Sequence, residues 1–439
     1  MKILITSDWN TDAINGVVTS INNLMYGLRA RGHEVKLLAL SSDHQTRITD
    51  DGWEVASLPA DFVYPEARVR VGLMNKIYDK VIEWRPDIVH SQCEFSTFLM
   101  AHHIAHECDI PIVHTYHTVY EDYTHYIGFK KLKFNKNGER VLHKKVATKA
   151  VAEFSKTISR FCEAIIAPTD KVKELLLSYN SKCPVFVVPS GIALEKFRQK
   201  LSIEERSALR KEYGINDDEK LALFLGRVAK EKNINEIIKY ISDDTDGTKL
   251  LVVGDGPELD NLKKLTKELN VTDRVSFAGM AEPSVVWKYY CAGDFFTSAS
   301  TSETQGLTYI EALSSGLPLL CRKDPCLDDV VDEGVNGCLF TNEEEFKTGL
   351  NTILKLINSK DYDREKIAMS ANKFSRECFA SSLEEIYLET IQTYKNNREN
   401  INRAESIKQI ASKIKEVLAL ELPLKGSSII GDEEDETED

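Results

Sequence analysis

The stretch "TSETQGLTYIEALSSGLP" (residues 301–318) decides the fold, because it joins the end of one element to the start of another. It carries two glutamates, Glu303 and Glu311, with Gly306 between them. The preceding run "DFFTSAS" predicts a buried strand, and "GLTYIEALSSG" predicts a helix that ends at its last glycine. The first N–H groups of such a helix are unpaired and lie at the positive end of its dipole. The stretch therefore predicts a strand–turn–helix unit that can hold a phosphate at the turn, with a carboxylate beside it for hydroxyl groups.

The same pattern recurs along the chain in both directions from this stretch. Short runs rich in Val, Ile, Leu and Phe alternate with amphipathic segments of helical length, which is typical of parallel sheets covered by helices on both faces. The series runs twice, with a break near residue 192, and the strands stop near residue 375. We therefore expect an α/β protein of two doubly wound, Rossmann-like parallel-sheet domains that face each other across a cleft, followed by helices. The expected parts are residues 1–192, 193–378 and 379–420, and an acidic disordered tail over 421–439.

Composition excludes several classes of protein. The 439 residues are 42% hydrophobic and 28% charged, which fits two globular domains. No run of 18 apolar residues predicts a transmembrane helix, and the start "MKILITSDWN" lacks the features of a signal peptide. Nine cysteines without a C-x-x-C pair predict neither a disulfide framework nor a zinc site, so a reducing cytoplasm fits best. The net charge of −13 argues against nucleic acid as a partner.

Basic residues and glycines follow other predicted strand ends. In "LFLGRVAKEKNI", Arg227 and Lys232 come after a glycine turn, and their side chains suit the oxygens of a diphosphate. Near the start of the chain, "NGVV" places Gly16 at a strand-to-helix turn, where a backbone without a side chain can approach a ligand. Because ligands of open parallel sheets bind at the carboxyl ends of the strands, we expect these residues to line one cleft.

Four motifs in this order carry a resemblance to a known family. The N-G-V turn, the "TYH" strand end at His117, G-R-x4-K and E-x7-E resemble the retaining glycosyltransferases of the GT-B fold (family 4 type), over roughly residues 1–390. "TYHTVYEDYTHY", "VPSGI", "AKEKNI" and "ETQGLTYIEAL" are similar to the bacterial 1,2-diacylglycerol 3-α-glucosyltransferases, which make monoglucosyldiacylglycerol. Thr304 and Gln305 depart from the Gly-Phe of most family members, and Ser190 stands where many have Asn.

The resemblance implies catalytic roles for the residues that carry charge. Arg227 and Lys232 would hold the nucleotide diphosphate and stabilise charge on the leaving UDP. Glu303 would bind the hydroxyls of the donor sugar, and His117 would contact that sugar beside the reacting carbon. Glu311 would bind the ribose hydroxyls.

The resemblance also implies roles for backbone groups. Gly16 would let the loop of the first domain approach the diphosphate, and Gln305, Gly306 and Leu307 would offer backbone N–H groups. No residue is assigned as nucleophile or general base, because the leaving phosphate oxygen would take the proton of the acceptor.

The function implied is transfer of glucose from UDP-glucose to the 3-hydroxyl of 1,2-diacylglycerol, in an α-linkage, for membrane glycolipid synthesis. Residues 1–192 would bind the acceptor and the membrane, residues 193–378 would bind the nucleotide sugar, and the last helices would pack back on the first domain. The resemblance implies no tightly bound cofactor and no catalytic metal, with Mg²⁺ at most a stimulating ion. The alternatives are UDP-galactose as donor, a glycosylated lipid or a soluble molecule as acceptor, a catalytically silent nucleotide-sugar-binding partner, and an epimerase.

A basic segment bears on the acceptor. Residues 128–161 hold ten basic and two acidic residues, a net charge of +8 within a chain of −13. Apolar residues lie among the lysines over 139–161, so an amphipathic helix at an anionic phospholipid surface is expected, with the enzyme peripheral on the inner face of the cell membrane. The alternative is a helix that packs inside the first domain with a solvated charged face. The predicted membrane-binding residues are Lys130, Lys131, Lys133, Lys136, Arg140, Lys144, Lys145 and Lys149.

Each candidate residue also has a purely structural interpretation. Glu303 could only complement a helix dipole, Glu311 could be half of a surface ion pair, and His117 could be a strand-end histidine with satisfied hydrogen bonds. Arg227 and Lys232 could form a solvated loop. The sequence "GDGPE" (254–258) lacks the full glycine-rich phosphate motif, so we interpret it as a tight turn with Pro257 at the start of a helix.

Overall fold

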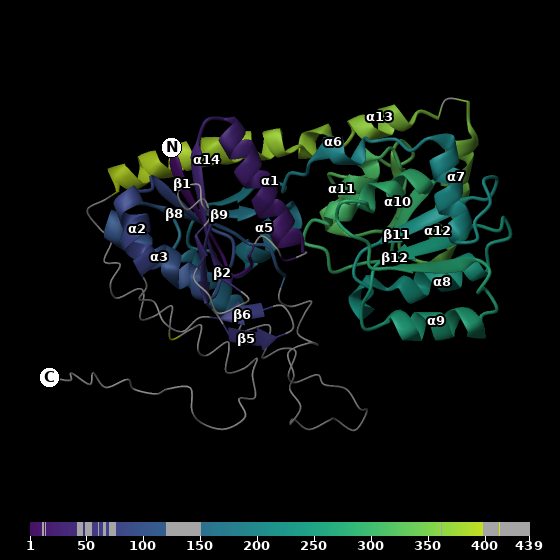
Figure 1. Ribbon diagram of the computed structural model, residues 1–439, viewed down its shortest axis with the longest axis horizontal. Coiled ribbons are helices and arrows are strands. Elements are labelled where there is room, and N and C mark those ends of the chain that lie inside the picture. The colour runs from purple at the N-terminus through teal and green to yellow at the C-terminus, as the bar shows by residue number, and fades with distance from the viewer. Residues whose placement is uncertain are drawn as a thin grey trace, which may run out of the picture.

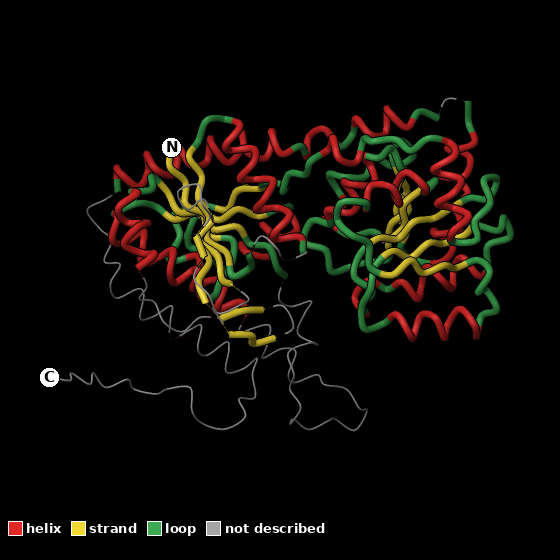
Figure 2. Tube along the Cα trace, in the orientation of Figure 1, coloured by secondary structure: helices red, strands yellow, loops and turns green. Residues whose placement is uncertain are grey.

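Two α/β domains lie side by side in a computed structural model of the chain (Figure 1). The described residues are 1–10, 13, 15–41, 47–48, 55–59, 61–64, 67–69, 76–119, 151–360, 362–397 and 412. Within these, only the backbone is described for residues 47–69. The sheets form the middle layer of each domain, with helices on both sides (Figure 2). This confirms the predicted α/β class and the pair of parallel-sheet domains.

The first domain is built on an eight-stranded sheet in the order β10-β9-β8-β7-β1-β2-β4-β3. All neighbouring strands are parallel except β3, which is antiparallel to β4. The strands are β1 (Lys2–Ser7), β2 (Glu34–Ser41), β3 (Arg47–Ile48), β4 (Val55–Pro59), β7 (Ile88–Ser91), β8 (Ile112–Thr115), β9 (Ala164–Ala167) and β10 (Val185–Val187). A separate antiparallel pair consists of β5 (Asp61–Tyr64) and β6 (Ala67–Val69).

Alternate residues of the first sheet face two different apolar layers. Leu4 of β1 packs with α2 (Lys76–Trp84), α3 (Ser96–Cys108), α5 (Asp170–Ser178) and a helix over residues 151–159. Ile3 and Ile5 face the other side, where they pack with α1 (Gly16–Ala30) and α14 (Arg376–Asn396). Because both faces are buried, the strands read as continuous apolar runs, as the sequence suggested.

The second domain has a six-stranded, fully parallel sheet in the order β13-β12-β11-β14-β15-β16. Its strands are β11 (Leu221–Leu225), β12 (Lys249–Val253), β13 (Val275–Gly279), β14 (Phe295–Ser298), β15 (Leu319–Arg322) and β16 (Gly337–Phe340). One face is covered by α8 (Ile234–Ser242), α9 (Leu259–Glu268) and α12 (Glu343–Asn358). The other is covered by α6 (Leu194–Phe197), α10 (Val286–Ala292), α11 (Leu307–Ser314) and α13 (Arg364–Met369), with α7 (Ile203–Glu212) beside α10.

Helix α14 follows the second domain in the sequence but packs on the first domain. Its N-cap Ser375 accepts a hydrogen bond from the N–H of Cys378, and the helix then runs along the first domain beside α1 (Figure 1). The two helices approach closely at Gly27, where a Cβ atom would lie 2.6 Å from the carbonyl oxygen of Arg376. The buried side chains Leu383 and Tyr387 of α14 thereby complete the apolar core of the first domain. Residues 398–439, apart from Ser412, lie outside the described residues.

The described half of the expected interfacial helix packs inside the first domain. Phe154 is 2% exposed and stacks on Phe95 at 5.8 Å, and Ile158 is 1% exposed. These apolar side chains face the sheet instead of a membrane, so the interfacial-helix prediction is wrong for residues 151–161. Burial removes the apolar surface of these side chains from water, which stabilises the folded domain. The predicted membrane-binding residues from Lys130 to Lys149 lie outside the described residues.

Candidate functional site

The turn between β14 and α11 has the predicted strand–turn–helix form. Gly306 takes a left-handed conformation, with φ of 75°, at the N-cap of α11. A Cβ atom at this position would lie 2.3 Å from the ring of Tyr309, so only glycine fits. The first N–H groups of α11 therefore start directly at a glycine that packs against the ring of Tyr309. Glu303 lies in the same turn, three residues before Gly306.

Glu303 and Lys232 are in direct contact. Lys232 ends a short 3-10 helix, η2 (Lys230–Lys232), after β11, and its Nζ donates to Oε1 of Glu303 at 2.5 Å. The side chains are only 15% and 20% exposed. Burial alone would raise the pKa of Glu303, but the charge and hydrogen bond of Lys232, a hydrogen bond from Ser300 and the charge of Lys171 together lower it. The site thus holds an ionised carboxylate in direct contact with an ammonium group.

Arg227 lies exposed in the turn that leads from β11 to Lys232. This turn packs against residues 254–258, because the N–H of Val228 donates to the carbonyl of Asp255 at 2.9 Å. The carbonyl of Val228 accepts from the N–H of Glu258 at 3.1 Å. The "GDGPE" sequence is therefore a tight turn that supports the Arg227 turn, although α9 starts at Leu259, two residues after Pro257.

Glu311 lies inside α11 and bonds to a tyrosine. Its Oε2 accepts from the hydroxyl of Tyr290, on α10, at 2.7 Å, so it is not half of an ion pair. Burial raises the pKa of Glu311 to about 7, against smaller lowering effects of the Tyr290 hydrogen bond and the Lys196 charge. Glu311 and Glu303 therefore have opposite pKa shifts, since only Glu303 has a cation in contact.

Gly16 of the first domain meets α11 of the second. A Cβ atom on Gly16 would lie 4.0 Å from Cδ1 of Leu307, which is ordinary van der Waals contact. Asn15 caps α1 by accepting from the N–H of Val18 at 2.9 Å, which fixes the start of this helix. The structure thus places the N-terminal ends of α1 and α11 against each other, one from each domain.

His117 lies just after β8 and is held by Gln92, which follows β7. Its Nε2 donates to Oε1 of Gln92 at 2.7 Å, so the ring proton is on Nε2 and Nδ1 is an acceptor. The N–H of Gln92 donates to the carbonyl of Thr6 in β1 at 2.9 Å, which fixes Gln92 at the sheet edge. Burial, and then the charge of His114, lower the pKa of His117 to about 3, so its imidazole is neutral at pH 7.

Residues 169–190 bond to the loop of Glu303 and so tie this loop to the first domain. Lys171 of α5 donates to the carbonyl of Glu303 at 3.1 Å. Thr169 donates through Oγ1 to the carbonyl of Thr304 at 2.9 Å. Gln305 accepts from the N–H of Ser190 at 2.8 Å and donates to the carbonyl of the same residue at 3.0 Å.

The sequence did not identify some of these residues and led to no prediction for the side chain of Gln305. Gln305 and Ser190, two of the three positions that depart from the family pattern, bond to each other, so the side chain of Gln305 points to Ser190. Gln92 could have been found, because it is a polar residue at the end of a buried strand, as His117 is. Nothing in the sequence marks Lys171 or Tyr290 as functional, since both lie on helices among ordinary helical residues.

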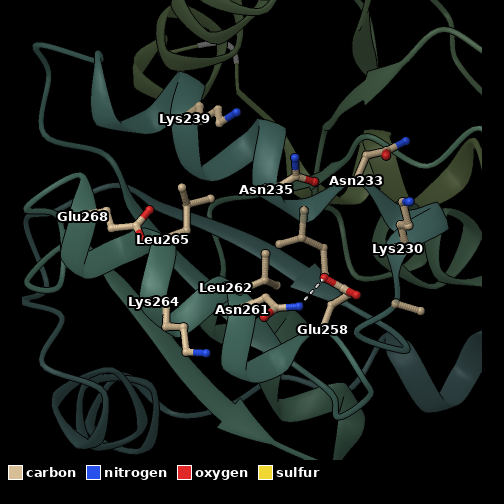
Figure 3. Close-up of a pocket in the computed structure, with 12 residues that line it drawn as sticks. Lys230, Asn233, Asn235, Lys239, Glu258, Asn261, Leu262, Lys264, Leu265 and Glu268 are labelled. Atoms are coloured by element: carbon tan, nitrogen blue, oxygen red, sulfur yellow. Dashed lines mark hydrogen bonds between the residues drawn. The ribbon is translucent and has the colours of Figure 1, made fainter. Parts of the chain in front are cut away.

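A separate hollow lies on the flank of the second domain, between α8 and α9 (Figure 3). Asn261 donates to Oε2 of Glu258 at 3.0 Å on its floor. The side chains of Lys239 and Lys264 extend in different directions, so they do not converge on one point (Figure 3). Neither Lys232 nor Glu303 lines this hollow. Within the residues that the structure describes, no group of three or more His, Cys, Asp or Glu side chains is placed to hold a metal ion.

The charges at these turns are of the kind that suits an anionic, hydroxyl-bearing ligand. Arg227, Lys232 and the N-terminal end of α11 are positive groups such as bind phosphate oxygens, and the carboxylates of Glu303 and Glu311 are acceptors such as bind hydroxyls. His117, in the first domain, is neutral at pH 7 and adds no charge. No helix in the described part of the chain is both long and apolar enough to cross a membrane.

Comparison with known proteins identifies the two domains. Residues 14–196 match the family model described as "Glycosyltransferase Family 4", and residues 205–374 match "Glycosyl transferases group 1". The α-monoglucosyldiacylglycerol synthase of Streptococcus pneumoniae is 33% identical over 438 residues, covering 97% of this chain and 95% of that protein. The protein of the same name from Acholeplasma laidlawii is 32% identical over 406 residues, covering 91% of this chain and 99% of that protein.

Solved structures share the fold at low sequence identity. Sucrose-phosphate synthase from Thermosynechococcus elongatus has a TM-score of 0.66 at 17% identity, covering 89% of this chain and 99% of that one. Anabaena Alr3699/HepE in complex with UDP and glucose has a TM-score of 0.63 at 16% identity, covering 89% of this chain and 100% of that one. The fold, the two family matches and the near full-length likeness together make this chain a glycosyltransferase of the GT-B fold, with a family 4 domain followed by a group 1 domain.

Proposed function

We propose that this enzyme transfers glucose from UDP-glucose to the 3-hydroxyl of 1,2-diacylglycerol, with retention, to give α-monoglucosyldiacylglycerol. The observation that supports this most is the likeness, over nearly the full length of the chain, to two α-monoglucosyldiacylglycerol synthases. The contact between Lys232 and Glu303 supports the donor half of the proposal, because it places a cation for phosphate beside a carboxylate for sugar hydroxyls.

In the proposed reaction, the second domain carries the donor. Lys232 and Arg227 hold the diphosphate and stabilise the charge that develops on UDP as the glycosidic bond to phosphate breaks. Glu303, whose pKa is lowered, accepts hydrogen bonds from the glucose hydroxyls. Glu311 bonds to the ribose, oriented by the hydroxyl of Tyr290.

The first domain completes the proposed site from the other side of the cleft. Gly16 allows the start of α1 to approach the diphosphate, and His117 contacts the sugar beside its reacting carbon. His117 cannot act as a proton donor in its imidazolium form near neutral pH, because its pKa is about 3. In the proposed step the acceptor hydroxyl passes its proton to the phosphate oxygen that is freed as the glycosidic bond breaks, and no side chain is assigned as general base.

The proposal extends to the membrane and to metal ions. The lysines and arginine between residues 130 and 149 bind anionic phospholipid, which brings the enzyme to its lipid acceptor on the inner face of the cell membrane. Arg227 and Lys232 supply the positive charge at the diphosphate, so Mg²⁺ acts at most as a stimulating ion and no cofactor is tightly bound.

The test is product formation from radiolabelled UDP-glucose, compared with UDP-galactose, in mixed micelles of diacylglycerol with and without anionic phospholipid. We expect label in the lipid phase with UDP-glucose, more of it with anionic lipid, and little dependence on Mg²⁺. A Glu303→Gln variant serves as the matched control for enzyme-dependent transfer. Label that enters lipid only from UDP-galactose would change the donor, and label that stays in water would discard the lipid acceptor.

A further inference from the structure

We propose that Lys171, on helix α5 of the first domain, is a positioning residue for the donor-sugar loop 301–305 of the second domain. Through it, the relative placement of the two domains sets the position of Glu303. This inference rests on the proposed function, because it takes Glu303 as the residue that binds the donor sugar. It concerns a residue that acts through the loop and does not itself touch the reacting atoms.

Lys171 crosses from one domain to the other and meets a carboxylate and two carbonyls. Its Nζ lies 2.9 Å from both carboxylate oxygens of Asp324. The same nitrogen donates to the carbonyl of Glu303 at 3.1 Å and lies 3.4 Å from the carbonyl of Thr301. An ammonium group has three N–H donors, so these partners account for its full capacity. The N–H donors of Lys171 thus bond to residues of the second domain.

Asp324 gives the contact its rigidity. Its side chain is only 6% exposed, and Oδ1 also accepts from the N–H of Cys326 at 2.9 Å, at the N-cap of η3 (Pro325–Leu327). A carboxylate so far from water needs a charged partner, and Lys171 supplies it from the other domain. Buried ion pairs often add little net stability, but they fix the geometry of the groups that they join. The group fixed here is the loop that carries Glu303.

The loop has further attachments on the same side. Thr169, two residues before Lys171, bonds to the carbonyl of Thr304, and the side chain of Gln305 bonds twice to the backbone of Ser190. On the other side of the loop, the carboxylate of Glu303 is held by Lys232. The backbone of the loop is therefore held by residues before position 192, and the Glu303 side chain by the second domain. Glu303 is fully placed only when the domains have this arrangement.

A Lys171→Met variant tests the inference in the full-length protein, since methionine keeps much of the aliphatic stem and removes the donors. Lys200→Met is the matched control, because Lys200 pairs with Glu365 at an exposed position of the second domain. Calorimetric titration measures the dissociation constants of UDP and of UDP-glucose for each protein. We expect UDP to bind within about twofold of the parent, because UDP lacks the sugar that Glu303 is proposed to hold, and UDP-glucose to bind about tenfold more weakly in Lys171→Met.

Hydrogen exchange gives a second readout that does not depend on the donor. In Lys171→Met, the peptide that contains residues 301–306 should exchange faster, while β14 and the Lys200→Met protein stay unchanged. Thr169→Val should move both readouts in the same direction by a smaller amount, and it leaves no buried charge unpaired. Unchanged exchange in the loop together with an unchanged ratio of the two dissociation constants would overturn the inference. A parent protein that binds neither UDP nor UDP-glucose would overturn the proposed function, while the exchange data would still decide the role of Lys171.

Discussion

Replacing Lys232 by alanine removes the cation that lies 2.5 Å from Glu303, and we expect turnover to fall about a hundredfold. A unit charge about 4 Å from a phosphate oxygen interacts with it by roughly 4 kcal/mol at a partly buried site. Arg227 and water would replace part of this interaction. A net loss of about 2.7 kcal/mol corresponds to the hundredfold decrease.

The same change should move the pH profile. Without Lys232, burial would dominate at Glu303, so its pKa would rise and its ionised form would be lost at a higher pH as the solution is acidified. The acid limb of kcat/KM for transfer from UDP-glucose should therefore shift upward in Lys232→Ala.

Lys230→Ala is the control for this experiment, because Lys230 is an exposed lysine in the same 3-10 helix. It should keep both the turnover and the pH profile of the parent enzyme. The reasoning is refuted if Lys232→Ala keeps turnover within about threefold, or if Lys230→Ala loses as much.

Three further predictions concern buried titratable groups. Burial raises the pKa of Asp8 to about 7, so the folded state binds more protons than the unfolded state between about pH 4 and 7. The free energy of unfolding therefore falls as pH rises through that window. Asp8→Asn can still accept from the N–H of Thr97, so thermal melts should show a higher Tm near pH 8 and little change near pH 4. Burial also raises the pKa of Glu311 to about 7, so UDP affinity measured by calorimetry should increase between pH 6 and 8, and Glu311→Gln should remove this dependence. Gln92→Glu should raise the pKa of His117, which NMR titration of the ring would measure. It should also lower kcat more than it raises KM for the donor. A pKa of His117 that stays unchanged would contradict the contact between the two side chains.

Much of the fold follows from patterns that are local in sequence. The alternation of apolar runs with amphipathic segments was enough to predict two parallel sheets, because strands buried on both faces must be apolar throughout. The turn at Gly306 was also readable, since a glycine before a helix start allows a left-handed cap. The direct contact between Lys232 and Glu303, which 71 residues separate, was not predicted, because the sequence indicated only that both residues would lie near one ligand.

What the sequence did not reveal depends on how distant elements meet. Lys171 and Asp324 are 153 residues apart, and their pairing requires the placement of the two domains. The apolar residues Phe154 and Ile158 have the spacing of an amphipathic helix, but spacing alone does not say whether the partner is a membrane or a sheet. The side chain of Gln305 turns to Ser190 because a buried amide must find a donor and an acceptor, which no local pattern indicates.

Within residues 1–397, as far as the structure describes them, the chain crosses between the domains at Ile192 and at Ser375, and these crossings lie side by side. Ile192 forms an isolated parallel bridge with Ser375, its N–H donates to the carbonyl of Phe374, and its own carbonyl accepts from the N–H of Arg376. These two crossings therefore support each other through backbone hydrogen bonds at the boundary between the domains. A fragment that ends at residue 192 would lack α14 and expose the apolar face of α1, so the first domain cannot be isolated intact by cutting the chain once.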